Sequence, residues 1–216
     1  MDLVELEKIK KKALEEHIPI IMDDTLEVVK KLIEENKPKK ILEIGTAVGY
    51  SASQFVRFSK EDVRVDTIEL NEERAKEALE NIKRLGIDKD VNIIIGNAVE
   101  VLPTLNEKYD MIFIDANKGK YPIFLREAIR LSHKGSLIIA DNVLYKGYVL
   151  SDYNKHKQRT AVRHLREYIA DMISNENLDS QILEVGDGLA ISIKKIWFFM
   201  DFWYNIIDFK SGDKKK

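Results

Sequence analysis

The 216-residue chain contains no cysteine. Disulfide bonds and thiolate metal sites are therefore excluded, and a reducing compartment, the cytoplasm, is the expected location. An excess of charge of one sign is also missing, because 35 basic and 37 acidic side chains give a net charge of −2. This balance provides no global attraction to nucleic acid, although it is compatible with a local basic patch. Residues 1–17 are charged and helical in character, and they lack the apolar core of a signal peptide.

Apolar runs and helical patterns alternate along the chain. Strands are predicted at 41–45, 64–69, 91–95, 110–115, 136–140, 180–185 and 189–194, and helices at 3–16, 25–36, 50–59, 72–85, 121–131 and 158–173. The first five strands are continuous apolar runs, as expected where helices cover both faces of a sheet. The order predicts an α/β fold with a doubly wound, mostly parallel seven-stranded sheet. The GDG turn between the last two strands predicts a hairpin, so that the last strand runs antiparallel.

No internal repeat or low-complexity linker divides the chain, so residues 1–195 are expected to form one domain. Residues 1–37 would supply N-terminal helices that cover the site, and Asp24 with Glu27 is expected to form a capping box for the second helix. Residues 196–209, IWFFMDFWYNIIDF, hold both tryptophans and four of the eight phenylalanines. This segment is too short to span a bilayer. It is interpreted as an amphipathic extension, with a membrane-surface helix or non-native sequence as alternatives.

The most informative stretch is ILEIGTAVGYSAS, residues 41–53. After a buried strand, Gly45 and Gly49 bracket a tight turn, Ser51 opens a helix, and Glu43 stands two residues before the first glycine. The pattern E-x-G-x-x-x-G-x-S places backbone N–H groups and a carboxylate around a cofactor that carries a nucleoside. The dinucleotide fingerprint G-x-G-x-x-G is absent, since positions 47 and 50 are not glycine. A cofactor without a pyrophosphate is therefore predicted.

Polar residues follow four consecutive predicted strands, at the edge where ligands of such sheets bind. Glu69 is placed to accept both hydroxyls of a ribose. Asn97 and the N–H group of Ala98 are candidates for binding an adenine edge. Two carboxylates and one amide oxygen follow the next two strands, and they suit a hard cation, Mg²⁺ best, with Ca²⁺ or Mn²⁺ as substitutes. These candidate metal ligands are Asp115, Asp141 and Asn142.

Each of these residues also has a purely structural interpretation. Asp115 could cap a helix, the pair Asp141 and Asn142 could form a turn, and Glu69 could be a solvated loop charge. Their joint placement at four strand ends favours a site. The histidines are scattered over helices and loops and are interpreted as structural or surface residues: His17, His133, His156 and His164. The lysine-rich run at 8–12 is interpreted as a solvated helix face, with a polyanion contact as the alternative.

Four motifs resemble those of the metal-dependent class I methyltransferases that use S-adenosylmethionine. They are EIGTAVGYS, TIEL, FIDANKGKY and ADNVLYKG, and the resemblance extends from about residue 18 to residue 195. Relatives in this family include catechol and caffeoyl-CoA O-methyltransferases, which have a Rossmann-like fold. The combination of FIDAxK with a later DN is specific to the metal-dependent branch. The resemblance therefore implies an O-methyltransferase that depends on S-adenosylmethionine and a divalent metal.

The resemblance also implies roles for individual residues. Lys118 falls where the catechol enzyme has its general base, and the backbone near Ile21 would touch the methionine end of the cofactor. One departure is Asn97, because many relatives carry Asp there. The remaining roles follow the motifs: Glu43, Gly45, Gly49 and Ser51 for the methionine part, Glu69 for the ribose, Asn97 and Ala98 for the adenine, and Asp115, Asp141 and Asn142 for the metal.

Among bacterial members, the chain is most similar to enzymes that methylate 5-hydroxyuridine in the tRNA anticodon, on the basis of DNVLYKGYV and RTAVRHLREY. A catechol and 5-hydroxyuridine both offer two vicinal oxygens to a metal, so the acceptor stays open between tRNA and a small catechol or hydroxycinnamoyl compound. Relatives are often homodimers, so a homodimer is expected. The candidate tRNA contacts are Lys8, Lys10, Lys11, Lys12, Lys146, Arg159 and Arg163, although Arg163 could instead pair with an acidic neighbour.

Two other classes of protein share parts of this pattern. A nicotinamide dehydrogenase would have the same strand–turn–helix start and an acid after the second strand, but the missing G-x-G-x-x-G counts against it. A non-catalytic binding protein could use the same fold. The retention of the metal set together with Lys118 argues against that alternative.

Overall fold

A computed structural model describes residues 1–59, 62–152 and 158–195. The aromatic segment 196–209 and His156 lie outside the described residues, so the expectations for them are not addressed by the structure. Within the described ranges, none of the helices combines the length and apolar character needed to cross a membrane.

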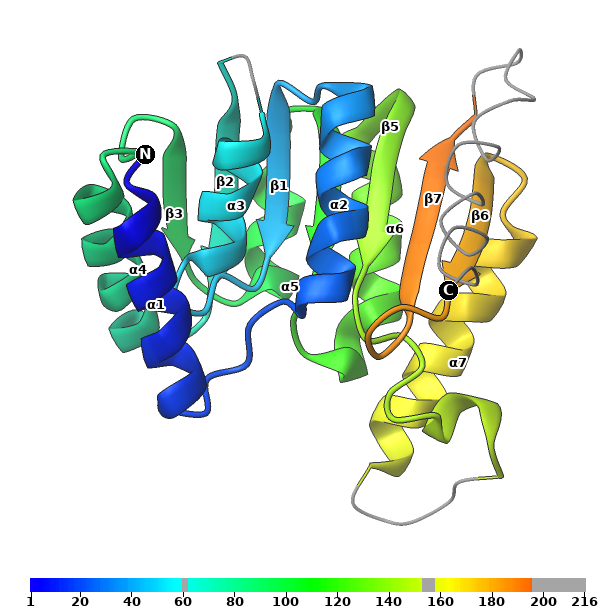
Figure 1. Cartoon of the computed structure of the whole chain (residues 1–216). Coiled ribbons are helices and arrows are strands. Elements are labelled where there is room, and N and C mark those ends of the chain that lie inside the picture. The colour runs from blue at the N-terminus through cyan, green and yellow to red at the C-terminus, as the bar shows by residue number, and fades with distance from the viewer. Residues whose placement is uncertain (60–61, 153–157, 196–216) are drawn as a thin grey trace, which may run out of the picture.

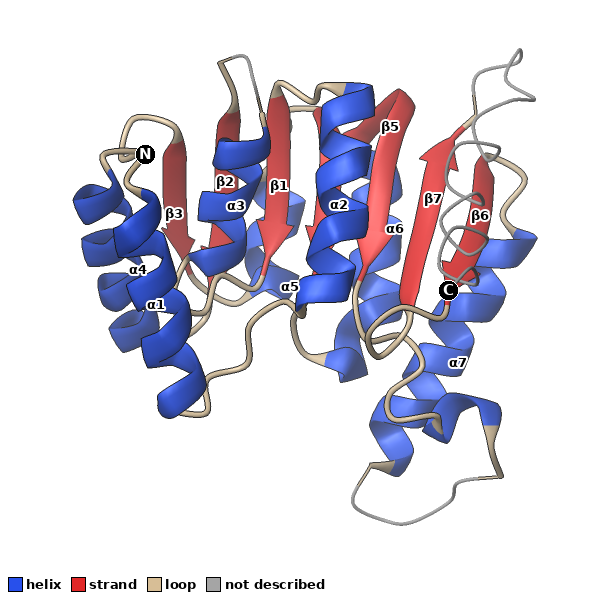
Figure 2. Ribbon diagram, viewed as in Figure 1, coloured by secondary structure: helices blue, strands red, loops and turns tan. Residues whose placement is uncertain are grey.

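All seven predicted strands form one sheet, in the order β3-β2-β1-β4-β5-β7-β6 (Figure 2). The first five strands are parallel, and β7 runs antiparallel to both β5 and β6, which confirms the predicted fold class. The strand order reverses direction between β1 and β4, which is where ligands bind in open α/β sheets. The strands are β1 (Lys40–Ile44), β2 (Arg64–Glu69), β3 (Val91–Ile95), β4 (Tyr109–Ile114), β5 (Ser132–Ala140), β6 (Leu178–Leu183) and β7 (Leu189–Lys194).

Helices cover both faces of the sheet (Figure 1). One face packs against α1 (Leu3–Glu15), α2 (Asp23–Asn36), α3 (Tyr50–Phe58) and α4 (Glu72–Leu85). The other face packs against α5 (Ala98–Val101), α6 (Tyr121–Leu131) and α7 (Arg159–Ser174). Three short 3₁₀ helices, η1 (Leu102–Thr104), η2 (Lys118–Lys120) and η3 (Tyr148–Leu150), lie in the connections.

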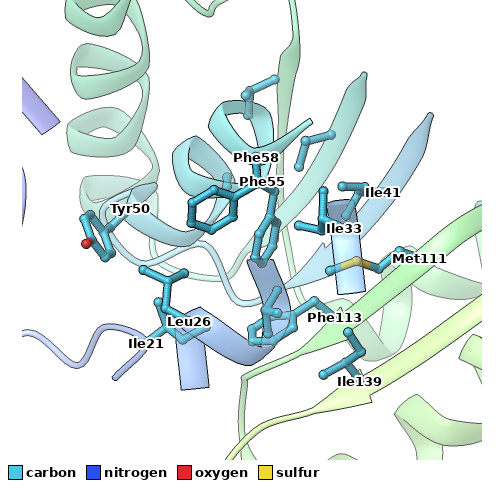
Figure 3. Close-up of a cluster of buried hydrophobic side chains, with 14 of the residues drawn as sticks. Ile21, Leu26, Ile33, Ile41, Tyr50, Phe55, Phe58, Met111, Phe113 and Ile139 are labelled. Atoms are coloured by element: carbon cyan, nitrogen blue, oxygen red, sulfur yellow. The ribbon is translucent and has the colours of Figure 1, made fainter. Parts of the chain in front are cut away.

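The continuous apolar character of the strands is explained by two separate cores. Along β1, Ile41 packs into the core beneath α1–α4, while Leu42 and Ile44 pack into the opposite core. Figure 3 shows the first core, where the rings of Phe55 and Phe113 meet edge to face with centroids 5.2 Å apart. Burial on both faces removes the alternation of polar and apolar residues that a one-sided strand would show.

The predicted capping box of the second helix is wrong. The helix begins at Asp23, so Asp24 lies within its first turn and not at the cap. The Asp24 carboxylate instead accepts hydrogen bonds from the N–H groups of Thr25 at 2.8 Å and of Gly186 at 2.9 Å. Gly186 lies in the turn between β6 and β7, so a tertiary contact replaces the local cap and ties α2 to the hairpin. Glu27 forms an ion pair with Lys30 at 3.7 Å.

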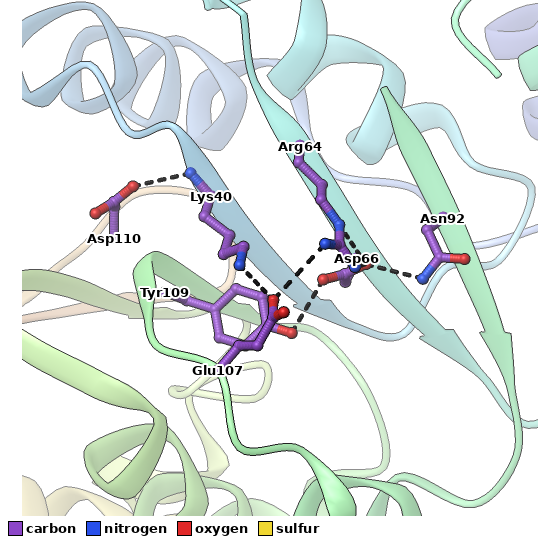
Figure 4. A network of polar contacts seen from close by, with 7 residues as sticks. All are labelled: Lys40, Arg64, Asp66, Asn92, Glu107, Tyr109 and Asp110. Atoms are coloured by element: carbon purple, nitrogen blue, oxygen red, sulfur yellow. Dashed lines mark hydrogen bonds and ion pairs between the residues drawn. The ribbon is translucent and has the colours of Figure 1, made fainter. Parts of the chain in front are cut away.

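A buried carboxylate joins three strands near their amino ends, away from the ligand-binding edge (Figure 4). Asp66 on β2 accepts hydrogen bonds from the Tyr109 hydroxyl of β4 at 3.0 Å and from the Asn92 amide of β3 at 2.8 Å. Its other close contact is the guanidinium of Arg64, whose Nη2 lies 3.0 Å from Oδ1. Asp66 therefore links β2 to its neighbour β3 and, across β1, to β4.

We expect Tyr109→Phe to lower the free energy of unfolding by about 1–2 kcal/mol, because it removes one hydrogen bond to a buried carboxylate. Urea denaturation would measure the change. Tyr168→Phe is the matched control, since the Tyr168 hydroxyl is buried without a hydrogen-bond partner among the described residues. Equal stability losses in the two variants would contradict a role for the Asp66 contact.

Candidate active site

A cavity of about 710 Å³ lies at the carboxyl ends of the five parallel strands. Each of these strands contributes a residue at or directly after its last paired position: Gly45, Glu69, Gly96, Asp115 and Asp141. The linker between α1 and α2, residues 19–22, also lines the cavity and crosses the same edge of the sheet (Figure 1). The strand ends predicted from sequence therefore converge on one space.

The glycine turn after β1 is dictated by close backbone contact. Gly45 has φ +105°, and a Cβ atom there would lie 2.2 Å from the carbonyl oxygen of Asp115, which no side chain can accommodate. Gly49 has φ +78° and precedes the first turn of α3, where a Cβ atom would lie 3.3 Å from the Cβ of Ala78. Gly45 thus lines the cavity, whereas Gly49 packs α3 against α4 and is not among the lining residues.

Glu43 lies behind the cavity wall and is fully buried. It accepts hydrogen bonds from the hydroxyl of Ser51 and, at 2.6 Å, from that of Thr67. Burial raises the pKa of Glu43 to about 8, although both hydroxyls oppose the shift. Ser51 itself lines the cavity, so Glu43 is placed to orient a lining residue, and its predicted contact with the cofactor stays a prediction.

Glu69 both lines the cavity and organises the turn beside it. Its Oε2 accepts hydrogen bonds from the N–H groups of Thr46 at 3.2 Å and Ala47 at 2.8 Å. On the neighbouring strand end, Asn97 accepts a hydrogen bond from the Val99 N–H at 3.1 Å and so caps α5. Asn97 and Ala98 line the same cavity, and their predicted contacts with an adenine stay predictions.

The four residues predicted to handle the metal and the acceptor come together at the ends of β4 and β5. The Lys118 ammonium lies 3.0 Å from Oδ1 of Asn142 and 4.0 Å from Oδ1 of Asp115. Oδ1 of Asp141 accepts the Asn142 N–H at 2.7 Å, while its Oδ2 is buried and has no hydrogen-bond partner among the described residues. Burial raises the pKa of Asp141 to about 7, and the charge of Asp115 contributes to the shift.

This donor set fits a divalent cation. An unpartnered, buried carboxylate oxygen beside a second carboxylate is unfavourable unless a cation or proton balances it. Burial also raises the pKa of Asp115, in the same sense. Within the described ranges, no three His, Cys, Asp or Glu side chains are grouped as metal ligands. A metal at this position would therefore need the amide oxygen of Asn142 as a third protein ligand.

Sequence reasoning missed Asp187, which lines the cavity from the turn between β6 and β7. Its carboxylate accepts a hydrogen bond from the N–H of Lys146, and its backbone carbonyl accepts one from Leu144 at 2.9 Å. The GDG turn predicted a hairpin but not its location. Because β7 runs antiparallel beside β5, its first residues lie next to the end of β5, which brings the turn to the site. Tyr145, also missed, lines the cavity beside this turn.

The lysine run of α1 is engaged in ion pairs, and Lys8, Lys11 and Lys12 are exposed while Lys10 is partly buried. The pairs are Lys8 with Glu5 (3.2 Å), Lys10 with Asp23 (2.6 Å), Lys11 with Glu15 (3.8 Å) and Lys12 with Glu77 (2.8 Å).

The other basic candidates lie after β5 and on α7. Lys146 is exposed in the loop after β5, and Arg159 and Arg163 are exposed on the first turns of α7. The guanidinium of Arg163 lies 3.5 Å from the ring Nε2 of its neighbour His164. Helix α7 contacts both η2, which carries Lys118, and η3.

Known proteins resemble the chain over most of its length. Residues 2–195 match the family described as O-methyltransferase. The chain is 39% identical over 166 residues to a catechol O-methyltransferase of Niastella koreensis, with 73% of this chain and 74% of the relative covered. It is similar to a crystal structure described as a caffeoyl-CoA O-methyltransferase from Staphylococcus aureus, with a TM-score of 0.82, 39% identity, and 88% and 92% of the two chains covered. It is also similar to an O-methyltransferase from Bacillus cereus in complex with S-adenosylhomocysteine, with a TM-score of 0.81, 27% identity, and 90% and 92% covered.

The raised pKa of the buried Glu43 predicts how the free energy of unfolding depends on pH. Its pKa is about 8 in the folded chain against a usual value of 4.5, so between these values the folded state keeps a proton that the unfolded state releases. Glu43 should therefore lower the free energy of unfolding as pH rises from 4.5 to 8, by a few kcal/mol at most. Glu43→Gln cannot ionise and should gain stability relative to the wild type over this range.

Urea denaturation at several pH values from 5 to 8.5 would measure the difference between Glu43→Gln and the wild type. Ser51→Ala is a useful companion variant, because it removes a hydrogen bond that favours the ionised carboxylate and should extend the loss of stability to higher pH. Parallel stability profiles for Glu43→Gln and the wild type would contradict the assigned pKa.

Proposed function

The chain belongs to the O-methyltransferase family and is an S-adenosylmethionine-dependent enzyme of the catechol and caffeoyl-CoA type, and we propose that it works with a divalent metal. The acceptor would be a hydroxyl with a vicinal oxygen, and we propose 5-hydroxyuridine in the tRNA anticodon, giving 5-methoxyuridine. The observation that carries the metal part is the buried, unpartnered Oδ2 of Asp141 near Asp115 and Asn142. O-methylation of a small catechol or hydroxycinnamoyl compound is the alternative.

The proposed cofactor contacts follow the lining of the cavity. Glu69 would hold the ribose, and Asn97 with Ala98 the adenine, because these residues line the cavity at the ends of β2 and β3. The methionine part would lie between the glycine turn and the linker at Ile21, which both line it. Glu43 would then contribute indirectly, by orienting Ser51. Gly49 would contribute through the packing of α3 against α4.

The proposed mechanism assigns each step to a residue near Asp115. Asp115, Asp141 and the amide oxygen of Asn142 would hold a divalent ion such as Mg²⁺, which would supply Lewis-acid activation of the acceptor hydroxyl. Lys118 would take the acceptor's hydroxyl proton, while the methyl group would pass from the sulfonium sulfur, which keeps the bonding electron pair, to the acceptor oxygen. Its position, 3.0 Å from Asn142 and 4.0 Å from Asp115, supports this role. Apolar lining from Ile21 and Phe124 would exclude water.

The basic residues that support an RNA acceptor lie after β5, on α7 and at the cavity, and not on α1. The lysines of α1 have acidic partners, so they offer little net charge to a phosphate backbone. Lys146, Arg159 and Arg163 are exposed, and Lys120 is exposed at the cavity itself. The alternative acceptor has its own support, because the Niastella koreensis relative is named a catechol O-methyltransferase.

The expected homodimer, the cytoplasmic location, the single domain of residues 1–195 and the role of the extension at 196–216 stay predictions. Light scattering in solution would test the oligomeric state directly.

We expect Lys118→Ala to reduce kcat by about 10²–10⁴, the usual contribution of a general base, while S-adenosylhomocysteine binding is retained. Single-turnover kinetics and calorimetry would measure the two quantities. Lys120→Ala is the matched control, because Lys120 lines the same cavity two residues further on. Turnover close to that of the wild type in Lys118→Ala would remove this residue from the mechanism.

We expect the protein to methylate hypomodified tRNA when it is supplied with labelled S-adenosylmethionine and Mg²⁺. Nucleoside mass spectrometry should identify the product as 5-methoxyuridine. Chelation should abolish transfer, and added Mg²⁺ should restore it. A catechol panel run in parallel tests the alternative acceptor. Transfer that is undiminished after thorough chelation would refute the metal, and methylation of catechols but not of tRNA would refute the RNA acceptor.

Charge reversal tests the same acceptor from the protein side. Arg159→Glu with Arg163→Glu should weaken tRNA binding and reduce its salt dependence, because fewer phosphate contacts remain. Lys8→Glu with Lys11→Glu is the control with the same change in charge, on a surface where acidic partners already balance the lysines. Equal effects of the two pairs would contradict the proposed RNA surface.

A further inference from the structure

The ends of β4 and β5 share a hydrogen-bond donor that the mechanism above does not use. Tyr121, the first residue of α6, is fully buried, and its hydroxyl donates to the carbonyl oxygen of Asp141 at 2.9 Å. The carbonyl oxygen of Ile114 lies 3.4 Å from the same hydroxyl, so the proton is shared unequally between two acceptors.

The two carbonyl groups belong to the peptides that lead into candidate metal ligands. The Ile114 carbonyl is part of the peptide bond to Asp115, and the Asp141 carbonyl is part of the peptide bond to Asn142. Asp141 lies one residue beyond the last register pairs of β5, which end at Ala140. Asn142 then adopts φ +55°, a left-handed conformation that must be held by its surroundings.

Tyr121 also contacts the candidate base. Its N–H donates to the carbonyl of Lys118, which closes η2, and the Lys118 ammonium lies 5.9 Å from the centroid of the Tyr121 ring. The Tyr121 side chain therefore contacts the peptides that precede Asp115 and Asn142. It also lies beneath the ammonium of Lys118. The ring of Tyr121 also meets the ring of Tyr168 of α7 edge to face, with centroids 5.5 Å apart.

We propose that Tyr121 is a positioning residue, whose hydroxyl fixes the ends of β4 and β5 relative to each other and so sets the geometry of the three metal ligands. This inference rests on the proposed metal dependence. The buried Asp141 carbonyl would lose the donor at 2.9 Å if the hydroxyl were removed, and the Asp141–Asn142 peptide would keep only the hydrogen bond of its N–H group to Asp141 Oδ1. Partners of metal ligands commonly affect metal affinity in this way.

The chain offers a matched pair of variants. Tyr121→Phe keeps the ring, its contact with Tyr168 and its position under Lys118, and removes only the hydroxyl. Tyr168→Phe removes a hydroxyl that is equally buried but has no hydrogen-bond partner among the described residues. The two changes are chemically identical and lie on neighbouring rings, so a general effect of losing a buried hydroxyl would affect both.

The experiment measures Mn²⁺ binding by calorimetry and by the spin-resonance signal of free Mn²⁺, with S-adenosylhomocysteine present. Tyr121→Phe should raise the Kd for Mn²⁺ by about 10–100-fold, and Tyr168→Phe should leave it unchanged. The affinity for S-adenosylhomocysteine without metal should be the same in all three proteins. Steady-state assays with Mg²⁺ should show a raised metal requirement for Tyr121→Phe, with kcat largely recovered at saturating Mg²⁺.

The outcomes separate the inference from the proposed function. If the wild type binds Mn²⁺ and Tyr121→Phe binds it equally well, the inference is overturned and the metal proposal stands. If Tyr121→Phe loses affinity for S-adenosylhomocysteine in parallel, the hydroxyl supports the whole cavity and the specific role is overturned. If the wild type itself does not bind Mn²⁺, the metal proposal fails and the inference fails with it.

Discussion

The contact between the ends of β1 and β4 is the constraint on which the site depends. At this point the order of the sheet reverses, and a Cβ atom on Gly45 would lie 2.2 Å from the carbonyl oxygen of Asp115. Only a glycine with φ +105° allows the two backbones to approach so closely. On one side of this contact the cavity is lined by the glycine turn and Glu69, and on the other by Asp115 and Asp141. A methyl donor and its acceptor, bound on opposite sides, would therefore meet beside Asp115.

Around that contact the fold buries acidic groups at a real cost. Burial is the largest cause of the raised pKa values of Glu43, Asp115 and Asp141, and their mutual repulsion contributes for Glu43 and Asp141. Local partners compensate only in part, through Ser51 and Lys118. Ligands that bring positive charge would relieve this repulsion, and both a sulfonium cofactor and a divalent ion do so. The electrostatics of these buried carboxyl groups thus favour the two positively charged ligands that the motifs indicate.

The sequence predicted those parts of the site that depend on local order. The strand ends carrying Glu69, Asp115 and Asp141 were identified because parallel strands bring their carboxyl ends to one edge, and the structure places all three on one cavity. Prediction failed where a partner is distant in the chain. The Asp24 carboxylate binds Gly186, which no local capping rule could anticipate. Asp187 reaches the site only because β7 inserts between β5 and β6. The start of β5 at 132 was missed as well, since its first four residues, SHKG, lack the apolar character of its centre.

The three residues proposed to bind the metal do not distinguish between the two acceptors, so the choice would depend on the residues around them. Two vicinal oxygens satisfy the proposed metal site whether they belong to a pyrimidine or to a catechol. Tyr145 lines the cavity, and its ring meets that of Tyr148, which is not a lining residue, edge to face with centroids 5.8 Å apart. The wall that Tyr145 forms suits any flat ring. The wall is held in place by Asp187, which binds the N–H of Lys146. What differs between the two acceptors is the phosphate backbone attached to one of them. Basic side chains around the cavity would therefore favour the acceptor that carries phosphates, and Lys146, Arg159 and Arg163 are exposed after β5 and on α7.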